Sequence, residues 1–197
     1  MPLPVHAAVV HLLFAGCLLV LPLAKGHAQS VVILSNSGDA RTCMQAAEWT
    51  ALQQQPSRTD TDACTRALEH SALSRRDRAA TLVNRGIVLV ALEDYQAALD
   101  DYNAAMQVMP ELPETYVSRG NLLFIADNLE AAIGDYDKAL DLMLGRSHVA
   151  FYNRGLASEK LGDRTAALAD FRQALELRPD FAQAQAKIDA LTAAAPP

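Results

Sequence analysis

The amino-acid sequence predicts an all-α protein, an α-solenoid in which one pair of helices is repeated three times. The first observation is an Arg-Gly pair that recurs at Arg85-Gly86, Arg119-Gly120 and Arg154-Gly155, in steps of 34 and 35 residues. The second observation is that small and bulky residues recur at fixed offsets around each pair. A fixed period of this length is typical of stacked helical units, which bury their apolar faces only against their neighbours.

The repeated positions define two helices in each unit. Counted from Ala79, position 4 is bulky, positions 8, 20 and 27 are small, position 24 is aromatic, and position 32 is proline in two units. Position 4 is Leu82, Tyr116 and Phe151, and position 8 is Gly86, Gly120 and Gly155. Position 20 is Ala98, Ala132 and Ala167, position 24 is Tyr102, Tyr136 and Phe171, and position 27 is Ala105, Ala139 and Ala174. Position 32 is Pro110, Leu144 and Pro179. Glycine lets two backbones approach closely, and an aromatic side chain fills the space beside them. Proline ends the second helix.

This pattern resembles the tetratricopeptide repeat, a family of helix-turn-helix units. The resemblance covers residues 79–181 and implies three units, at 79–112, 113–146 and 148–181, with one extra residue before the third unit. Position 11 departs from the family, because it is not aromatic in any unit. The second unit also lacks the closing proline.

The segments on either side of the repeats complete the expected architecture. Residues 38–72 hold two helical patterns and predict a degenerate helix pair at the N-terminal end; residues 63–68 resemble the second helix of a repeat. Residues 182–192 predict a capping helix, which a solenoid needs to cover its last apolar face. Residues 29–37 are predicted to be a linker, and residues 193–197 a tail.

Residues 1–28 predict a secretory signal peptide. An apolar stretch runs from about Ala7 to Ala24, and small residues before Gln29 favour cleavage after Ala28, although Lys and Arg are absent from the first 24 residues. We therefore expect an exported, periplasmic protein. Two alternatives stay open, namely a retained membrane anchor and a lipoprotein attached through Cys17, which closes a sequence similar to a lipidation box.

Beyond this segment the sequence contains two cysteines, Cys43 and Cys64. An even count in an exported protein predicts a disulfide, which would contribute about 3 kcal/mol for a loop of about 20 residues. Two buried thiols are the alternative. A redox-active pair is not favoured, because the Cys-x-x-Cys spacing is absent. We also expect Trp49 to pack within the N-terminal helix pair.

A second regularity joins the two helices of each unit. Position 7 is always arginine and position 23 is always aspartate, which predicts structural ion pairs that fix the helix geometry. The pairs are Arg85 with Asp101, Arg119 with Asp135, and Arg154 with Asp170. The alternative is a row of arginines that binds anions, which is weaker because each arginine has an acid at a fixed offset.

The family resemblance implies that the first helix of each unit lines an inner, concave surface that contacts a partner protein. The contact residues carried over are Val83, Asn84, Ile87, Val90 and Ala91 in the first unit; Val117, Asn121, Phe124 and Ile125 in the second; and Tyr152, Asn153 and Leu156 in the third. These residues predict an apolar groove rimmed by asparagines, suited to an extended segment or an amphipathic helix. The alternative is that neighbouring helices or the N-terminal helix pair cover these residues. Capture of a terminal carboxylate is not expected, because only Lys160 is basic at these positions.

Charge and composition argue against other classes of function. The net charge is −6, which disfavours nucleic acid and anionic membranes as partners. Beyond residue 28 the two histidines, His70 and His148, lie far apart, and neither a metal-ligand spacing nor a Gly-rich phosphate loop occurs. We predict an adaptor or scaffold rather than an enzyme, with no cofactor and no metal. A homo-oligomeric structural subunit of an envelope assembly is the alternative.

Overall fold

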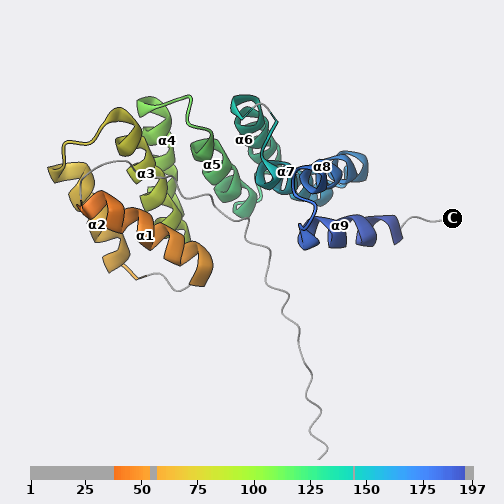
Figure 1. Cartoon of the computed structure of the whole chain (residues 1–197), viewed down its shortest axis with the longest axis horizontal. Helices are drawn as coiled ribbons and strands as arrows, with labels where there is room; N and C mark the ends of the chain where they lie inside the picture. Colours follow the sequence, from red (N-terminus) through yellow and green to blue (C-terminus); the bar gives the residue numbers. More distant parts are fainter. Residues whose placement is uncertain (1–37, 54–56, 144, 194–197) are drawn as a thin grey trace, which may run out of the picture.

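The computed structural model describes residues 38–53, 57–143 and 145–193, and confirms the all-α solenoid (Figure 1). Within these ranges the chain forms helices and connecting loops, without a strand. The helices are α1 (Gly38–Gln53), α2 (Thr59–His70), α3 (Arg75–Ala91), α4 (Tyr95–Val108), α5 (Pro113–Ile125), α6 (Leu129–Leu142), α7 (His148–Lys160), α8 (Arg164–Leu177) and α9 (Ala182–Ala193). The predicted signal peptide with Cys17, the linker, and all but the first residue of the tail lie outside the described residues.

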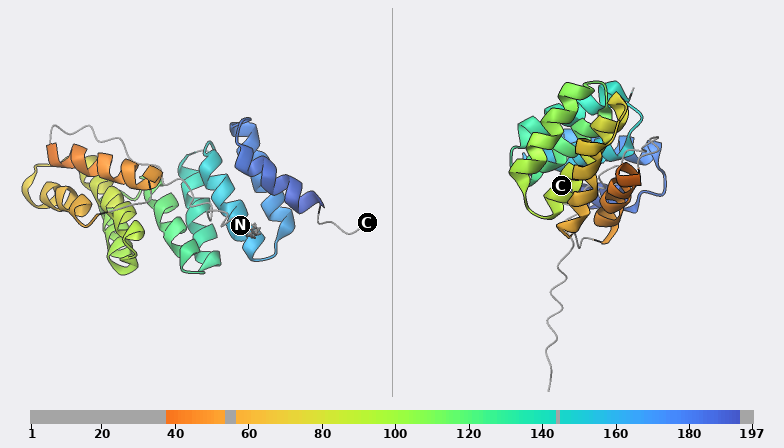
Figure 2. Two further views of the ribbon diagram at one scale, coloured as in Figure 1. Left: turned by 90° about the horizontal axis from the view of Figure 1, so that it is seen from below. Right: turned by 90° about the vertical axis from the view of Figure 1, so that its left-hand side faces the viewer.

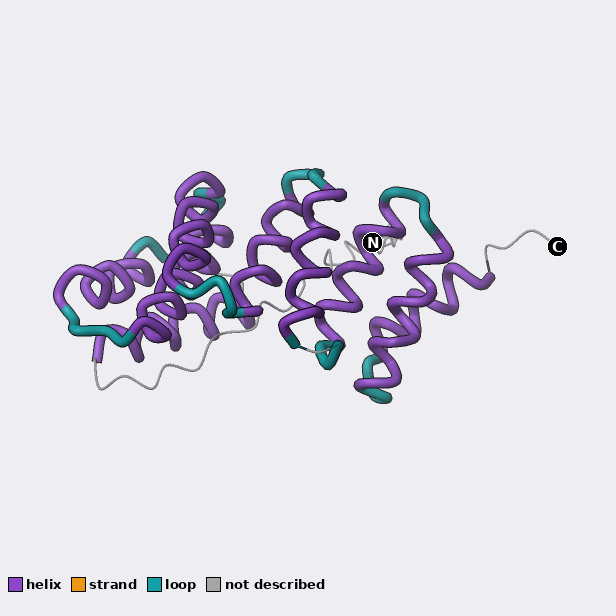
Figure 3. The backbone as a smooth tube through the Cα atoms, turned by 90° about the horizontal axis from the view of Figure 1, so that it is seen from above, coloured by secondary structure: helices purple, strands orange, loops and turns teal. Residues whose placement is uncertain are grey.

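The helices stack as antiparallel pairs along the long axis of the molecule (Figure 2). The predicted repeats correspond to the pairs α3–α4, α5–α6 and α7–α8, while α1–α2 lies at one end and α9 at the other. The loops gather along the two long edges of the stack (Figure 3). Consecutive pairs therefore present equivalent helices on equivalent faces.

Local sequence explains where the helices begin and end. Ser74, Asp94, Ser147 and Asp163 cap α3, α4, α7 and α8 by accepting a hydrogen bond from a backbone N–H in the first turn. Ser147 is the extra residue before the third unit, so the irregular spacing supplies a helix cap. In each unit, the second residue beyond the end of the first helix has a positive φ; these residues are Glu93 (63°), Asp127 (61°) and Gly162 (86°).

The core of each unit is a contact between the glycine at position 8 and the aromatic ring at position 24. A Cβ atom added to the glycine would lie less than 3 Å from that ring; the shortest distances are 2.4 Å for Gly86 and Tyr102, 2.7 Å for Gly120 and Tyr136, and 2.8 Å for Gly155 and Phe171. Each ring is at most 1% exposed. The absence of a side chain at position 8 is thus what allows the two helices to close around the ring.

Both ends of the stack are covered by helices. At the C-terminal end, Phe181 packs against the Tyr152 ring, with the ring centroids 4.9 Å apart, and Ala184 of α9 is buried beside them. At the N-terminal end, α1 buries Ala40, Cys43 and Ala47. The prediction that Trp49 packs within this pair is wrong: its side chain is 59% exposed, because it lies off the buried face of α1.

Candidate functional site

In each repeat, two nitrogens of an arginine donate hydrogen bonds to an aspartate. Nε and Nη2 of the arginine donate to the two carboxylate oxygens, at distances of 2.7 and 2.7 Å for Arg85 and Asp101, 2.8 and 2.7 Å for Arg119 and Asp135, and 2.8 and 2.6 Å for Arg154 and Asp170. The aspartate side chains are only 7–8% exposed. These are bidentate pairs of the kind that fixes geometry best.

The remaining nitrogen of each arginine reaches back to the preceding helix pair. Nη1 donates to Thr65 Oγ1 (3.1 Å) from Arg85, to Asn103 Oδ1 (2.9 Å) from Arg119, and to Asp137 Oδ1 (2.5 Å) from Arg154. Each arginine therefore ties together both helices of its own unit and the second helix of the unit before it. We call Arg85, Arg119 and Arg154, together with the side chains that accept their hydrogen bonds, the arginine ladder. Sequence reasoning missed the residues that accept these contacts, although Asn103 and Asp137 both stand at position 25 of their units and are polar.

The electrostatics of the ladder favour a structural role. Hydrogen bonding to Asp101, Asp135 and Asp170 raises the pKa values of Arg85, Arg119 and Arg154 above their usual value, although burial acts in the opposite direction. Nε, Nη1 and Nη2 of all three arginines are engaged by neighbouring side chains. The geometry thus gives no support to the alternative reading of an anion-binding row.

The structure places the twelve expected contact residues at very different depths. Half of them are at most 7% exposed and belong to the interior; they are Val83, Asn84, Ile87, Val117, Tyr152 and Asn153. In α3 the cause is the N-terminal helix pair, since Ala47 of α1 and Leu68 of α2 share one buried cluster with Val83 and Ile87. For these six residues the expectation of an open groove is corrected: neighbouring helices cover them.

The asparagines do not form the expected polar rim. Asn121 Oδ1 accepts hydrogen bonds from the Tyr136 hydroxyl (2.9 Å) and from Asn153 Nδ2 (2.8 Å), which ties α5 to α6 and α7. Asn84 is fully buried, and neither of its polar atoms finds a hydrogen-bond partner within the described part of the chain. These side chains therefore act inside the stack.

The accessible part of the inner surface lies at the C-terminal ends of the first helices. Val90, Ala91, Asn121, Phe124 and Leu156 are half-buried, and Ile125 is 48% exposed. Lys160 Nζ lies 5.2 Å from the centre of the Phe124 ring and 2.7 Å from Asp127 Oδ1, so the ends of α5 and α7 meet here. We call Phe124, Ile125, Asp127 and Lys160 the α5–α7 patch.

Other features of the described residues bear on catalysis and membrane insertion. His148 lies edge-on to the Phe181 ring, with ring centroids 5.3 Å apart, and 3.4 Å from an Arg178 nitrogen. No group of three or more His, Cys, Asp or Glu side chains in the described ranges is arranged to hold a metal ion. Among the described helices, none has the length and apolar character needed to cross a bilayer.

The fold and its repeated contacts define an α-solenoid of stacked helix pairs, and comparison with known proteins shows which family this fold resembles. Residues 148–181 match the sequence model of the tetratricopeptide repeat. No curated protein is similar enough to the chain to match it. Residues 148–181 thus form a tetratricopeptide repeat, and the stacked helix pairs have the fold of this family, as the sequence pattern predicts.

Solved structures of this family superpose on much of the chain. The first TPR of Spaghetti (RPAP3), bound to an HSP90 peptide, is 25% identical, with a TM-score of 0.57 over 59% of this chain and 91% of that one. The TPR domain of Arabidopsis OM64 is 22% identical, with a TM-score of 0.58 over 61% and 98%. MamA is 17% identical, with a TM-score of 0.62 over 82% and 85%. The Spaghetti complex links this fold to protein–protein interaction in general.

Proposed function

We propose that the protein is a non-enzymatic adaptor that binds a segment of a partner protein at the α5–α7 patch. The observation that carries this proposal is the exposure of Ile125 beside the half-buried Phe124, on the inner helix of the central repeat. Adjacent apolar side chains that stay accessible together on a folded surface can form part of a binding site, whereas a single exposed apolar residue is ordinary. The Spaghetti domain, which has a peptide bound to the same fold, supports this assignment.

The charges around the patch favour apolar capture over capture of a carboxylate. Lys160 is paired with Asp127, and Glu159 is paired with Lys187 of α9 at 2.6 Å. A partner that used Lys160 would have to displace a carboxylate already in place. We therefore propose that an apolar side chain of the partner covers Ile125 and Phe124, while the paired charges at the rim set its orientation.

Replacing Ile125 by aspartate should weaken partner binding at least about tenfold, because it removes apolar contact area and buries a charge in the complex. The matched control is Leu177→Asp, since Leu177 is 41% exposed and is likewise the last residue of its helix. Both variants should keep the helical circular dichroism of the parent. Affinity is measured by titration with the partner that the parent chain captures from a cell extract.

The two variants separate the proposal from its rivals. If the Ile125→Asp variant binds the partner with the same affinity as the parent, the α5–α7 patch is not the binding site. If the chain instead self-associates, so that its mass in solution rises with concentration, the protein is a homo-oligomeric structural subunit and the adaptor proposal is wrong.

We further propose that the protein is exported. The apolar stretch from Ala7 to Ala24 supports this, and so does a disulfide between Cys43 and Cys64, since disulfides persist in oxidising compartments. Expression of the full chain in a bacterium should yield a periplasmic protein whose intact mass corresponds to a start at Gln29. A lipid on Cys17 would identify a lipoprotein, and an uncleaved protein in the membrane fraction would identify an anchor; either result contradicts cleavage after Ala28.

A further inference from the structure

The helix pair α1–α2 occupies the place of a fourth repeat, although its sequence lacks the repeat's glycine and aromatic residue. The arginine ladder establishes the register. Arg119 reaches Asn103, the residue after Tyr102, and Arg154 reaches Asp137, the residue after Tyr136. Arg85 reaches Thr65, the residue after Cys64. Cys64 therefore stands where the repeats carry their aromatic ring.

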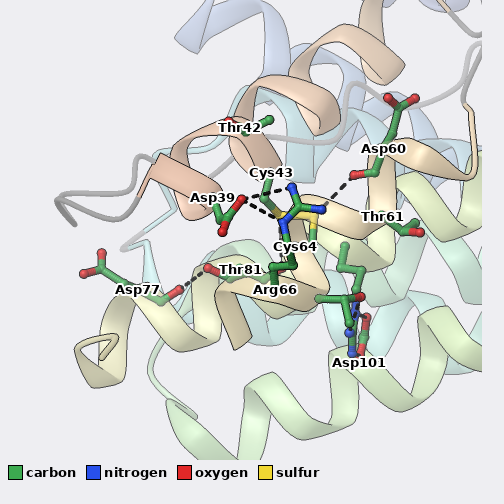
Figure 4. The surroundings of a disulfide bond; sticks show 12 residues. Asp39, Thr42, Cys43, Asp60, Thr61, Cys64, Arg66, Asp77, Thr81 and Asp101 are labelled. Atoms are coloured by element: carbon green, nitrogen blue, oxygen red, sulfur yellow. Dashed lines mark hydrogen bonds and ion pairs between the residues drawn. A yellow bond between two sulfur atoms is a disulfide. The ribbon is translucent and has the colours of Figure 1, made fainter. Parts of the chain in front are cut away.

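A second position supports this register. In each repeat the alanine three residues after the aromatic is fully buried; these are Ala105, Ala139 and Ala174. Ala67 stands three residues after Cys64 and is likewise fully buried. Cys64 is bonded to Cys43 of α1 (Figure 4), whereas the ring of Tyr102 lies on Gly86 of α3. A disulfide thus replaces the contact between glycine and aromatic ring that closes the other units.

Apart from the disulfide, the contact between α1 and α2 is made largely of small side chains. Their buried side chains are small except for Leu68; they are Ala40, Cys43, Ala47, Thr50, Ala63, Cys64 and Ala67. The ion pair between Asp39 and Arg66 is solvent-exposed, and such pairs contribute little to stability. Without the covalent bond, two thiols would fill far less of the space between the helices than the ring of Tyr102 fills in the next unit.

The pair covers a surface that already contains an unfavourable group. Val83 and Ile87 of α3 share a buried cluster with Ala47 and Leu68 of the pair, and Cys43 Sγ lies 3.7 Å from the Thr81 carbonyl oxygen of α3. Asn84 lies between Val83 and Ile87 in α3, and neither of its polar atoms finds a hydrogen-bond partner among the described residues, which is an unfavourable way to bury an amide. Opening of α1–α2 would expose the face of α3 that Val83 and Ile87 occupy.

We propose that the Cys43–Cys64 disulfide is a redox latch that keeps the fourth repeat closed over α3. A dithiol reductant passes two electrons and two protons to the bond, the S–S bond breaks, two S–H bonds form, and the reductant becomes a disulfide. The reduced pair then opens and exposes the inner face of α3. This inference concerns the covering of α3 and does not depend on the α5–α7 patch.

Hydrogen exchange measured by mass spectrometry on the full chain tests the latch, with Cys17→Ala in every sample so that the pair supplies the only thiols. In the oxidised protein, the amides of α1 and α2 should exchange slowly. Dithiothreitol should speed their exchange about 100-fold and also raise exchange in residues 80–88. The helices α5 to α8 should be unaffected and serve as the internal reference.

The matched variant is Cys43→Gly with Cys64→Tyr, which installs the contact used by the other repeats. Its helices α1 and α2 should be protected equally with and without dithiothreitol. If the parent stays protected after both thiols have been shown to be free, packing alone holds α1–α2 and the latch is wrong. If the variant is unprotected in both conditions, the disulfide does not take the place of the glycine–aromatic contact, and the assignment of a fourth repeat is wrong.

Discussion

Replacing Tyr102 by alanine is expected to lower the free energy of unfolding by about 3–5 kcal/mol. The ring is 1% exposed and lies directly on Gly86, where even a Cβ atom would come within 2.4 Å of it. Glycine cannot move a side chain into the space that the ring leaves. The cavity therefore stays open, and the first repeat loses the contact that closes it.

Urea unfolding followed by circular dichroism measures this loss, and Tyr102→Phe is its control. Phe171 fills the equivalent place in the third unit without a hydroxyl, so the phenylalanine variant should change stability by less than about 1 kcal/mol. Burial raises the pKa of Tyr102, so its hydroxyl stays neutral and carries no charge whose loss could confuse the comparison. A loss below about 1 kcal/mol for the alanine variant would show that the ring does not close the unit.

Replacing Arg119 by alanine is expected to cost about 3 kcal/mol, because it leaves the carboxylate of Asp135 buried without its partner. The arginine side chain is 24% exposed and that of the aspartate 8%, so water can reach the lost charge only in part. The substitution also removes the contact of 2.9 Å with Asn103, which joins the central repeat to the first. Equilibrium unfolding in urea measures the total effect.

The double variant Arg119→Ala/Asp135→Ala separates the two contributions. It should recover about half or more of the loss, since no buried charge then remains unpaired. Asn103→Ala alone should cost less than about 1.5 kcal/mol, the range of one ordinary hydrogen bond. Equal losses in the single and the double variant would indicate that Asp135 is hydrated without Arg119, and that the ladder adds little to stability.

Much of the fold could be predicted because the recurring residues indicate which helices contact each other, and not only where the helices lie. A glycine and an aromatic residue 16 positions apart, three times over, imply two helices that close around a ring, and Gly86 and Tyr102 show that contact. The pairing of arginine with aspartate follows from the same kind of recurrence. Position 25 recurs only as a polar residue, with no fixed chemistry, so the contacts between units were harder to recognise.

The candidate site was less predictable, because periodicity identifies a face of a helix but not what covers that face. Val83 and Ile87 belong to an inner face, as expected, yet α1 and α2 bury them. Coverage by the N-terminal helix pair is the alternative that the sequence leaves open, and periodicity alone does not decide between that coverage and an open groove. Ile125 differs because it is the last residue of α5, where the covering helices no longer reach it.

The arginine ladder makes the order of the units directional. Each internal unit offers an acceptor to the unit that follows it and an arginine to the unit before it, whereas the residue after Phe171 is Arg172, a cation that cannot accept such a bond. Genetic duplication of an internal unit, such as residues 113–147, would therefore supply both an arginine and an acceptor. The copy could then form the ladder contacts with the unit before it and with the unit after it. Adding a unit at the α9 end would first require Arg172 to be replaced by a residue that can accept a hydrogen bond. Duplication of the central repeats needs no such change.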